Sequence, residues 1–106
     1  TYIDNVIQMN VLAITTENDT ALNQVYNTAV GDRTTLVELV DYLKKYLSEY
    51  DPEIRRVNVI HGDNRKGDIP HSLASVDKAK ELLNYQPTHL IEKGIQEAVS
   101  WYWKNI

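Results

Sequence analysis

The fold class depends on residues 35–52, TLVELVDYLKKYLSEYDP, which predict one well-defined helix. Thr35 and Glu38 have the spacing of a capping box, in which each side chain accepts a hydrogen bond from a backbone N–H of the other residue. Asp41 and Lys45 stand four residues apart, so we expect them to form a surface ion pair. The Asp-Pro pair at the end of the stretch should stop the helix. An apolar face repeats at helical period: Leu36, Leu39, Val40, Leu43, Leu47 and Tyr50.

Short apolar runs flank this helix on both sides. Residues 25–30 read as a strand that ends at Gly31, and Val57, Val59 and Ile60 read as a second short strand. A strand, a helix and a further strand in succession indicate the α/β class. We therefore expect a partial α/β fold, with helices and a few short strands.

Helices are also expected near both ends of the chain. Residues 4–16 predict a helix that Asp4 or Asn5 could cap, and its apolar residues lie nearly all round it. Such a helix is normally buried on most sides. In an isolated chain one side would be exposed, which favours self-association or a missing partner domain.

The second half of the chain predicts two more helices. Ser75 is placed to cap a short one that runs to about Leu83, and Asn84 suits the left-handed conformation that ends a helix. An amphipathic last helix follows from the offsets of four apolar residues: Ile91, Ile95, Ala98 and Tyr102.

Residues 61–71 form the longest irregular segment of the prediction, and such loops often carry function. Arg65 offers a planar fork of donors that matches phosphate oxygens, and Gly67 permits a tight bend. Asp68 can accept hydrogen bonds from sugar hydroxyls, and Ser72 follows with a small hydroxyl side chain. This combination suits a sugar nucleotide, although a solvated turn would use the same residue types.

Several motifs in one order resemble the C-terminal portion of the extended short-chain dehydrogenases, specifically the UDP-hexose 4-epimerases and most closely the branch acting on UDP-N-acetylglucosamine. The resemblance covers essentially the whole chain. The motifs that carry it are Tyr2-Ile3-Asp4-Asn5-Val6, residues 23–31, Arg33-Thr34-Thr35-Leu36, the Arg65 loop, residues 75–78 with Ala79 and Leu82-Leu83, and Tyr85-Gln86-Pro87.

The resemblance implies roles for three substrate-binding residues. Arg65 resembles the arginine that contacts the nucleotide diphosphate, and Asp68 resembles the carboxylate that accepts from the ribose. Ser72 stands where a tyrosine excludes the N-acetyl group in epimerases restricted to unacetylated sugars. A small side chain there leaves room, which indicates a UDP-N-acetylhexosamine substrate.

The NAD-binding and proton-shuttle motifs of these enzymes are absent from the chain. Its glycines, Gly31, Gly62, Gly67 and Gly94, cannot form the dinucleotide fingerprint, and no tyrosine has a lysine four residues later. We therefore expect residues 1–106 to be a single, truncated substrate-binding segment of a Rossmann-type enzyme that lacks its dinucleotide-binding domain. NAD would serve the intact parent, a homodimer by expectation, whereas this segment alone should bind no cofactor and have no activity.

Two alternatives stay open at this stage. The chain could belong to a related nucleotide-sugar dehydratase or decarboxylase, whose distinguishing catalytic residues would lie upstream. It could also be a stand-alone, non-catalytic binding module.

Composition excludes several other classes. The net charge of −4 gives no basic surface for nucleic acid, and no apolar run is long enough to span a membrane. The chain has no cysteine, which rules out disulfides and thiolate metal sites and fits a cytoplasmic protein. His61, Asp63, Asp68 and His71 lack the fixed spacing of a metal motif, so we expect no metal site there.

Overall fold

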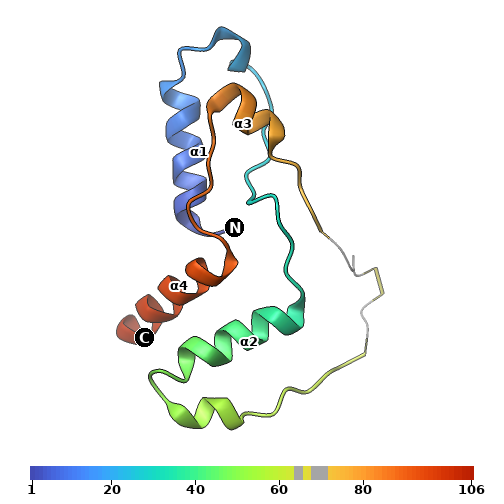
Figure 1. Ribbon diagram of the computed structural model, residues 1–106, viewed down its shortest axis with the longest axis vertical. Coiled ribbons are helices and arrows are strands. Elements are labelled where there is room, and N and C mark those ends of the chain that lie inside the picture. The colour runs from blue at the N-terminus through green and yellow to red at the C-terminus, as the bar shows by residue number, and fades with distance from the viewer. Residues whose placement is uncertain (64–65, 68–71) are drawn as a thin grey trace.

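The structure is a computed structural model that describes residues 1–63, 66–67 and 72–106. These residues form an elongated, flat molecule of 53 × 36 × 19 Å. Two halves can be followed in Figure 1: α1 and α3 lie side by side in one, α2 and α4 lie in the other, and long irregular segments connect them. The helices are α1 (Ile3–Thr15), α2 (Leu36–Leu47), α3 (Asp77–Leu83) and α4 (Ile91–Asn105), with the 3-10 helices η1 (Asp19–Ala21) and η2 (Pro52–Arg56).

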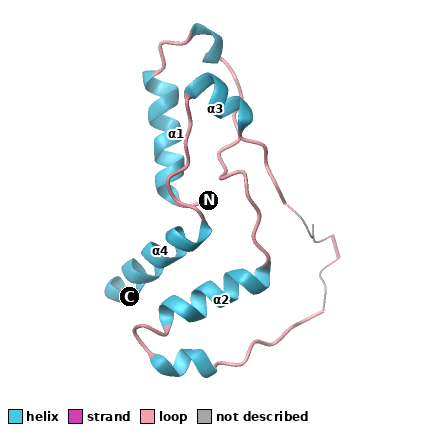
Figure 2. Cartoon of the chain, viewed as in Figure 1, coloured by secondary structure: helices cyan, strands magenta, loops and turns pink. Residues whose placement is uncertain are grey.

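The expected α/β class is wrong for the described residues, which contain helices and loops but no strand (Figure 2). Residues 25–30 and 57–60 are irregular, and Val25 and Ile60 are 86% and 91% exposed. A strand needs a neighbouring strand to pair its N–H and C=O groups, and no ladder is formed along either segment. The β-branched side chains of both segments favour a strand, but the described residues offer no neighbouring strand with which to pair.

The α1–α3 half, which also contains η1, is built around an apolar core. Its buried members are Met9, Ala21, Val76, Ala79, Leu83 and Tyr85. Tyr85 is completely buried, and its hydroxyl donates to the Ala29 carbonyl at 2.8 Å. Asn84 adopts φ 53° and ψ 32°, which confirms the left-handed helix end and turns the chain so that Tyr85 enters the core.

At the start of α3, Ser75 has the expected local role only in part. Its hydroxyl accepts from the Asp77 N–H at 3.3 Å, but Val76 occupies the capping position.

The α2–α4 half consists of α2, η2 and α4, and α2 packs against α4. The capping box is confirmed: the Glu38 N–H donates to the Thr35 hydroxyl, and the Thr35 N–H donates to the Glu38 carboxylate at 2.8 Å. Lys45 pairs with Glu92 of α4 at 2.6 Å, so the expected Asp41–Lys45 pair is wrong.

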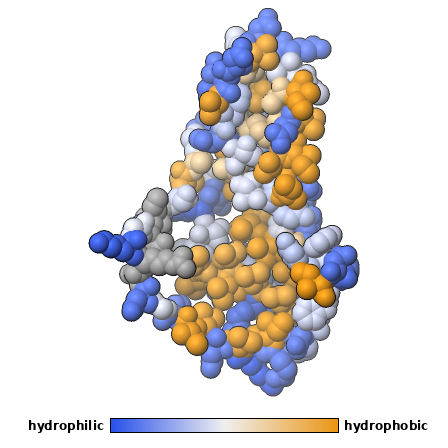
Figure 3. Space-filling view, turned by 180° about the vertical axis from the view of Figure 1, so that it is seen from behind, coloured by the Kyte–Doolittle hydropathy of each residue, from blue (hydrophilic) through white to orange (hydrophobic). Residues whose placement is uncertain are grey.

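Two aromatic contacts and an exposed apolar surface complete the α2–α4 half. The Tyr46 hydroxyl donates to Glu92 at 2.8 Å, and the rings of Tyr50 and Trp103 stack at 5.2 Å. Seen from behind, apolar side chains gather over α2 and α4 (Figure 3). Leu36, at the start of α2, and Leu90, directly before α4, are 78% and 54% exposed.

Asn5 joins the two halves. Because α1 begins at Ile3, Asn5 lies inside its first turn and does not cap it, contrary to expectation. Its fully buried amide oxygen accepts from the N–H groups of Thr88 and His89 at 2.9 and 3.2 Å, and its amide nitrogen donates to the His89 carbonyl at 2.7 Å. The start of α1 is thereby fixed to the connector, residues 84–90, which leads from α3 into α4.

Close packing at Gly94 reinforces this junction. A Cβ atom at Gly94 would lie 3.0 Å from the Cβ of Tyr2, so the glycine lets the residue before α1 rest directly on α4. None of the helices in the described part of the chain combines the length and apolarity that a membrane span requires.

Candidate functional site

A groove of about 480 Å³ lies where the two halves meet. One wall is the first turns of α4, which present a small, apolar surface through Ile91, Gly94, Ile95 and Ala98. The loop that precedes α2 also lines the groove, through Asp32, Arg33 and Thr34. Ser72 and Ala74 line the groove from the segment that leads to α3, and Thr1 and Tyr2 close one side.

Ser72 is the one predicted substrate-binding residue that the structure describes. It is exposed and lines the groove together with residues of α4. Arg65 and Asp68 lie outside the described residues, so the structure does not test their assigned contacts.

Arg33 is a groove residue that the sequence did not identify as a ligand-binding candidate. Its side chain is exposed, and within the described residues it takes part in no salt bridge. Its backbone N–H donates to the Asp32 carboxylate at 2.7 Å, which shapes the turn before the capping box of α2. A guanidinium next to an apolar wall suits an anionic or polar ligand. The available signal was its place in the Arg33-Thr34-Thr35-Leu36 motif that carries the family resemblance.

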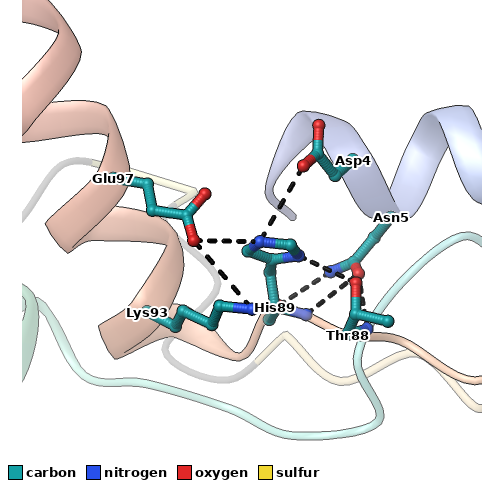
Figure 4. A network of polar contacts seen from close by, with 6 residues as sticks. All are labelled: Asp4, Asn5, Thr88, His89, Lys93 and Glu97. Carbon is teal, nitrogen blue, oxygen red and sulfur yellow. Dashed lines mark hydrogen bonds and ion pairs between the residues drawn. The ribbon is translucent and has the colours of Figure 1, made fainter.

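His89 lies at the edge of the same groove and belongs to a second polar cluster (Figure 4). Its imidazole Nδ1 is 2.8 Å from the Thr88 hydroxyl oxygen, and its Nε2 is 3.2 Å from Glu97 Oε1 and 3.8 Å from Asp4 Oδ2. The Tyr2 ring stacks on the imidazole at 4.8 Å. Three separate segments, α1, the connector and α4, thus bring together groups that are far apart in the sequence.

Burial and the two carboxylates, Asp4 and Glu97, both act on the Tyr2 hydroxyl at this cluster. Burial raises the pKa of the Tyr2 hydroxyl above its ordinary value of 10.0, and the negative charges of Glu97 and Asp4 raise this pKa further. Lys93 places a cation beside the cluster, with its Nζ 3.9 Å from Glu97 Oε1, the same oxygen that lies 3.2 Å from His89 Nε2. Among the described residues, Asp4, His89 and Glu97 have ligand atoms within 4.8 Å of one another, close enough to hold a metal ion.

Of the metal arrangement that the sequence disfavours, Asp68 and His71 lie outside the described residues. His89 was not singled out from the sequence. The sequence shows only that His89 follows a threonine and precedes an amphipathic helix. The groups around the imidazole come from α1 and α4, which are distant in the sequence.

Comparison with known proteins identifies distant relatives. No family model matches the chain. It is 28% identical over 82 residues to a probable UDP-glucuronate 4-epimerase of Rhizobium meliloti (strain 1021), a match that covers 77% of this chain and 22% of that protein. It is 42% identical over 41 residues to the UDP-glucuronate 4-epimerase of Thermodesulfobacterium geofontis (strain OPF15), covering 39% of this chain and 13% of that protein.

The chain therefore spans about a fifth or less of the length of these two relatives. The similarity is weak and partial, and it supports the nucleotide-sugar epimerases as a group without specifying UDP-N-acetylglucosamine. The chain is distantly related to UDP-glucuronate 4-epimerases.

Proposed function

We propose that this chain is the C-terminal substrate-binding part of an NAD-dependent UDP-sugar 4-epimerase. The observation that carries the proposal is the similarity to a UDP-glucuronate 4-epimerase over 77% of the chain. The groove supports it, because Ser72 and Arg33 line it together with apolar residues of α4, a combination suited to a polar ligand with a flat sugar or base.

In the whole enzyme, bound NAD would supply the reversible hydride transfer that inverts C4 of the sugar, and no residue of this chain is assigned to hold it. The part proposed for this chain is to bind the nucleotide sugar, with Arg65 on the diphosphate, Asp68 on the ribose and Ser72 beside the hexose. The isolated chain is expected neither to bind NAD nor to convert any UDP-sugar.

Two hexoses are supported by different observations. The small Ser72 side chain leaves room for an N-acetyl group, which favours UDP-N-acetylglucosamine. The names of the relatives favour UDP-glucuronate, and the Arg33 guanidinium in the same groove could pair with a carboxylate. We propose the N-acetylhexosamine as the substrate and treat the uronate as the second candidate.

A chimera tests the proposed function directly. Residues 1–106 would replace the matched segment of the Rhizobium meliloti protein, and calorimetry with NAD would first establish that the chimera is folded. We expect the NAD-loaded chimera to bind and epimerise a UDP-sugar. A chimera that binds NAD but no UDP-sugar would contradict the proposal.

Two variants of the chimera distinguish the sugars. Ser72→Tyr places a ring where an N-acetyl group would lie, so we expect kcat/KM for UDP-N-acetylglucosamine to fall by about 10- to 100-fold, with UDP-glucose spared. Arg33→Gln should lower kcat/KM selectively for UDP-glucuronate if a carboxylate is bound. Equal losses on all sugars in the Ser72 variant would remove the support for the N-acetyl assignment.

The outer face of α1 supports a partner for this segment. Its side chains repeat at helical spacing and are all more than half exposed: Ile3, Ile7, Val11 and Ile14. We propose that a dinucleotide-binding domain covers this face in the homodimeric parent, and that the isolated chain self-associates through it. Sedimentation over a concentration series should show a mass that rises with concentration, and Ile7→Lys should reduce it. A monomer at every concentration would contradict self-association.

A further inference from the structure

We propose that Asp4, His89 and Glu97 form a binding site for a divalent transition-metal ion, with Zn²⁺ as its representative. The proposal is independent of the epimerase function, because it uses none of the residues assigned to the nucleotide sugar. It rests on one imidazole nitrogen and two carboxylate oxygens that converge from α1, the connector and α4 (Figure 4).

The spacing of the donor atoms fits a metal. Zinc bonds of about 2.0–2.1 Å in a tetrahedron place neighbouring ligand atoms roughly 3.3 Å apart. His89 Nε2 lies 3.2 Å from Glu97 Oε1 and 3.8 Å from Asp4 Oδ2. All three ligand atoms lie within 4.8 Å of one another, and rotation of the exposed Asp4 side chain would complete the metal geometry. Nitrogen and carboxylate donors together favour Zn²⁺, Co²⁺ or Mn²⁺ over Ca²⁺ or Mg²⁺.

The ring and the backbone of His89 are both held in place, as those of a metal ligand usually are. The imidazole is stacked by Tyr2, and its Nδ1 lies 2.8 Å from the Thr88 hydroxyl, which can accept the Nδ1 proton and leave the Nε2 lone pair facing the carboxylates. The residue is only 8% exposed, and Asn5 fixes its backbone from both sides. In that tautomer the Nε2 lone pair is available to a cation that lies between the two carboxylates.

The two carboxylate side chains are partly exposed, so an ion can reach the site from solvent. Their side chains are 52% and 41% exposed in Asp4 and Glu97, so a metal can enter from solvent and water can complete its coordination. Their two negative charges neutralise a divalent ion. The competing cation, Lys93, lies 3.9 Å from Glu97 on an exposed side chain, a weak pair that a metal would readily replace.

The test is titration of the untagged 106-residue chain with Zn²⁺ by calorimetry and with Co²⁺ by visible absorption. We expect one equivalent to bind and Co²⁺ to give the intense bands of a tetrahedral site. Asp4→Asn and Glu97→Gln should each weaken the affinity by more than about tenfold, since even a partner of a ligand is worth 10- to 100-fold. Both positions are about half exposed, so these variants should fold, which circular dichroism would verify.

Control variants separate this site from adventitious binding. His61→Gln/His71→Gln removes the other two of the three histidines and should leave the affinity unchanged. Glu81→Gln, an exposed carboxylate on α3, should also have no effect. The proposal is overturned if no saturable binding occurs, if the affinity is lost in the double histidine variant, or if it survives both Asp4→Asn and Glu97→Gln.

Discussion

The two halves of this molecule are held together by different forces. The α1–α3 half encloses Tyr85, Leu83 and Ala79 at 3% exposure or less, and its contacts are mainly apolar. The α2–α4 half buries Tyr46 and Val99 but depends on Lys45 and Tyr46 meeting one carboxylate, Glu92, and on stacking between exposed rings.

This difference indicates where stability and function reside. Burial of apolar surface is the main source of folding free energy, whereas exposed ion pairs contribute little. The α1–α3 half should therefore be the more stable one. The α2–α4 half presents its exposed apolar side chains and the wall of the groove to a partner or ligand, so it should loosen first.

The largest effect is expected from Tyr85→Ala in the α1–α3 half. Removing this completely buried ring should lower the free energy of unfolding by about 3 to 5 kcal/mol, as for other large aromatic core residues. Urea unfolding measures the change, and Tyr102→Ala, which removes a ring that is 56% exposed, is the matched control. Similar losses in both variants would show that the apolar core is not the stronger element.

Asn5→Ala should separate the two halves. The substitution leaves the N–H groups of Thr88 and His89 and the His89 carbonyl without their buried partner, at a cost of about 2 to 3 kcal/mol. Hydrogen exchange should show faster exchange at these amides. Asn10→Ala, an exposed asparagine of the same helix, is the control and should change neither quantity.

Thr35→Ala tests the start of α2 alone. Loss of the capping box should cost about 1 kcal/mol, and the increase in hydrogen exchange should be confined to the first turn of α2. Thr34→Ala changes the neighbouring exposed threonine and should have no such effect. Faster exchange throughout the α1–α3 half would mean that the two halves unfold as one unit.

The smallest effect concerns pH. Hydrogen bonds from Lys45 and Tyr46 lower the pKa of Glu92 below its ordinary value of 4.5, and those from Thr35 lower the pKa of Glu38 in the same sense. A lowered pKa in the folded state stabilises the fold above 4.5, and this contribution is lost as pH falls through the lowered value. We therefore expect the α2–α4 half to loosen in acid.

Tryptophan fluorescence reports selectively on the α2–α4 half, because both tryptophans of the chain lie on α4. In thermal unfolding between pH 3 and 6, Glu92→Gln should reduce the dependence of Tm on pH, with Glu38 supplying the remainder. Glu81→Gln, on α3, should leave that dependence intact. An unchanged pH dependence in Glu92→Gln would show that this carboxylate does not link α2 to α4.

Local signals in the sequence were sufficient for the elements that local contacts stabilise. The Thr35–Glu38 capping box and the left-handed Asn84 were predicted and are confirmed, because their hydrogen bonds and backbone angles involve neighbours in the chain. The apolar period of residues 91–102 likewise predicted α4. The strands were predicted wrongly because a strand depends on a pairing segment that β-propensity does not specify.

The candidate site also has features that the sequence predicts and features that only the tertiary structure decides. The sequence by itself determined the helices, the small side chain of Ser72 and the resemblance to sugar-nucleotide enzymes. Only the tertiary structure decided that Arg33 shares a groove with Ser72, that Lys45 pairs with Glu92 and not with Asp41, and that Asn5 and His89 meet across 84 residues. The physical reason is that a cap or a turn is a contact between near neighbours, whereas a groove or a ligand cluster is formed by segments that packing alone brings together.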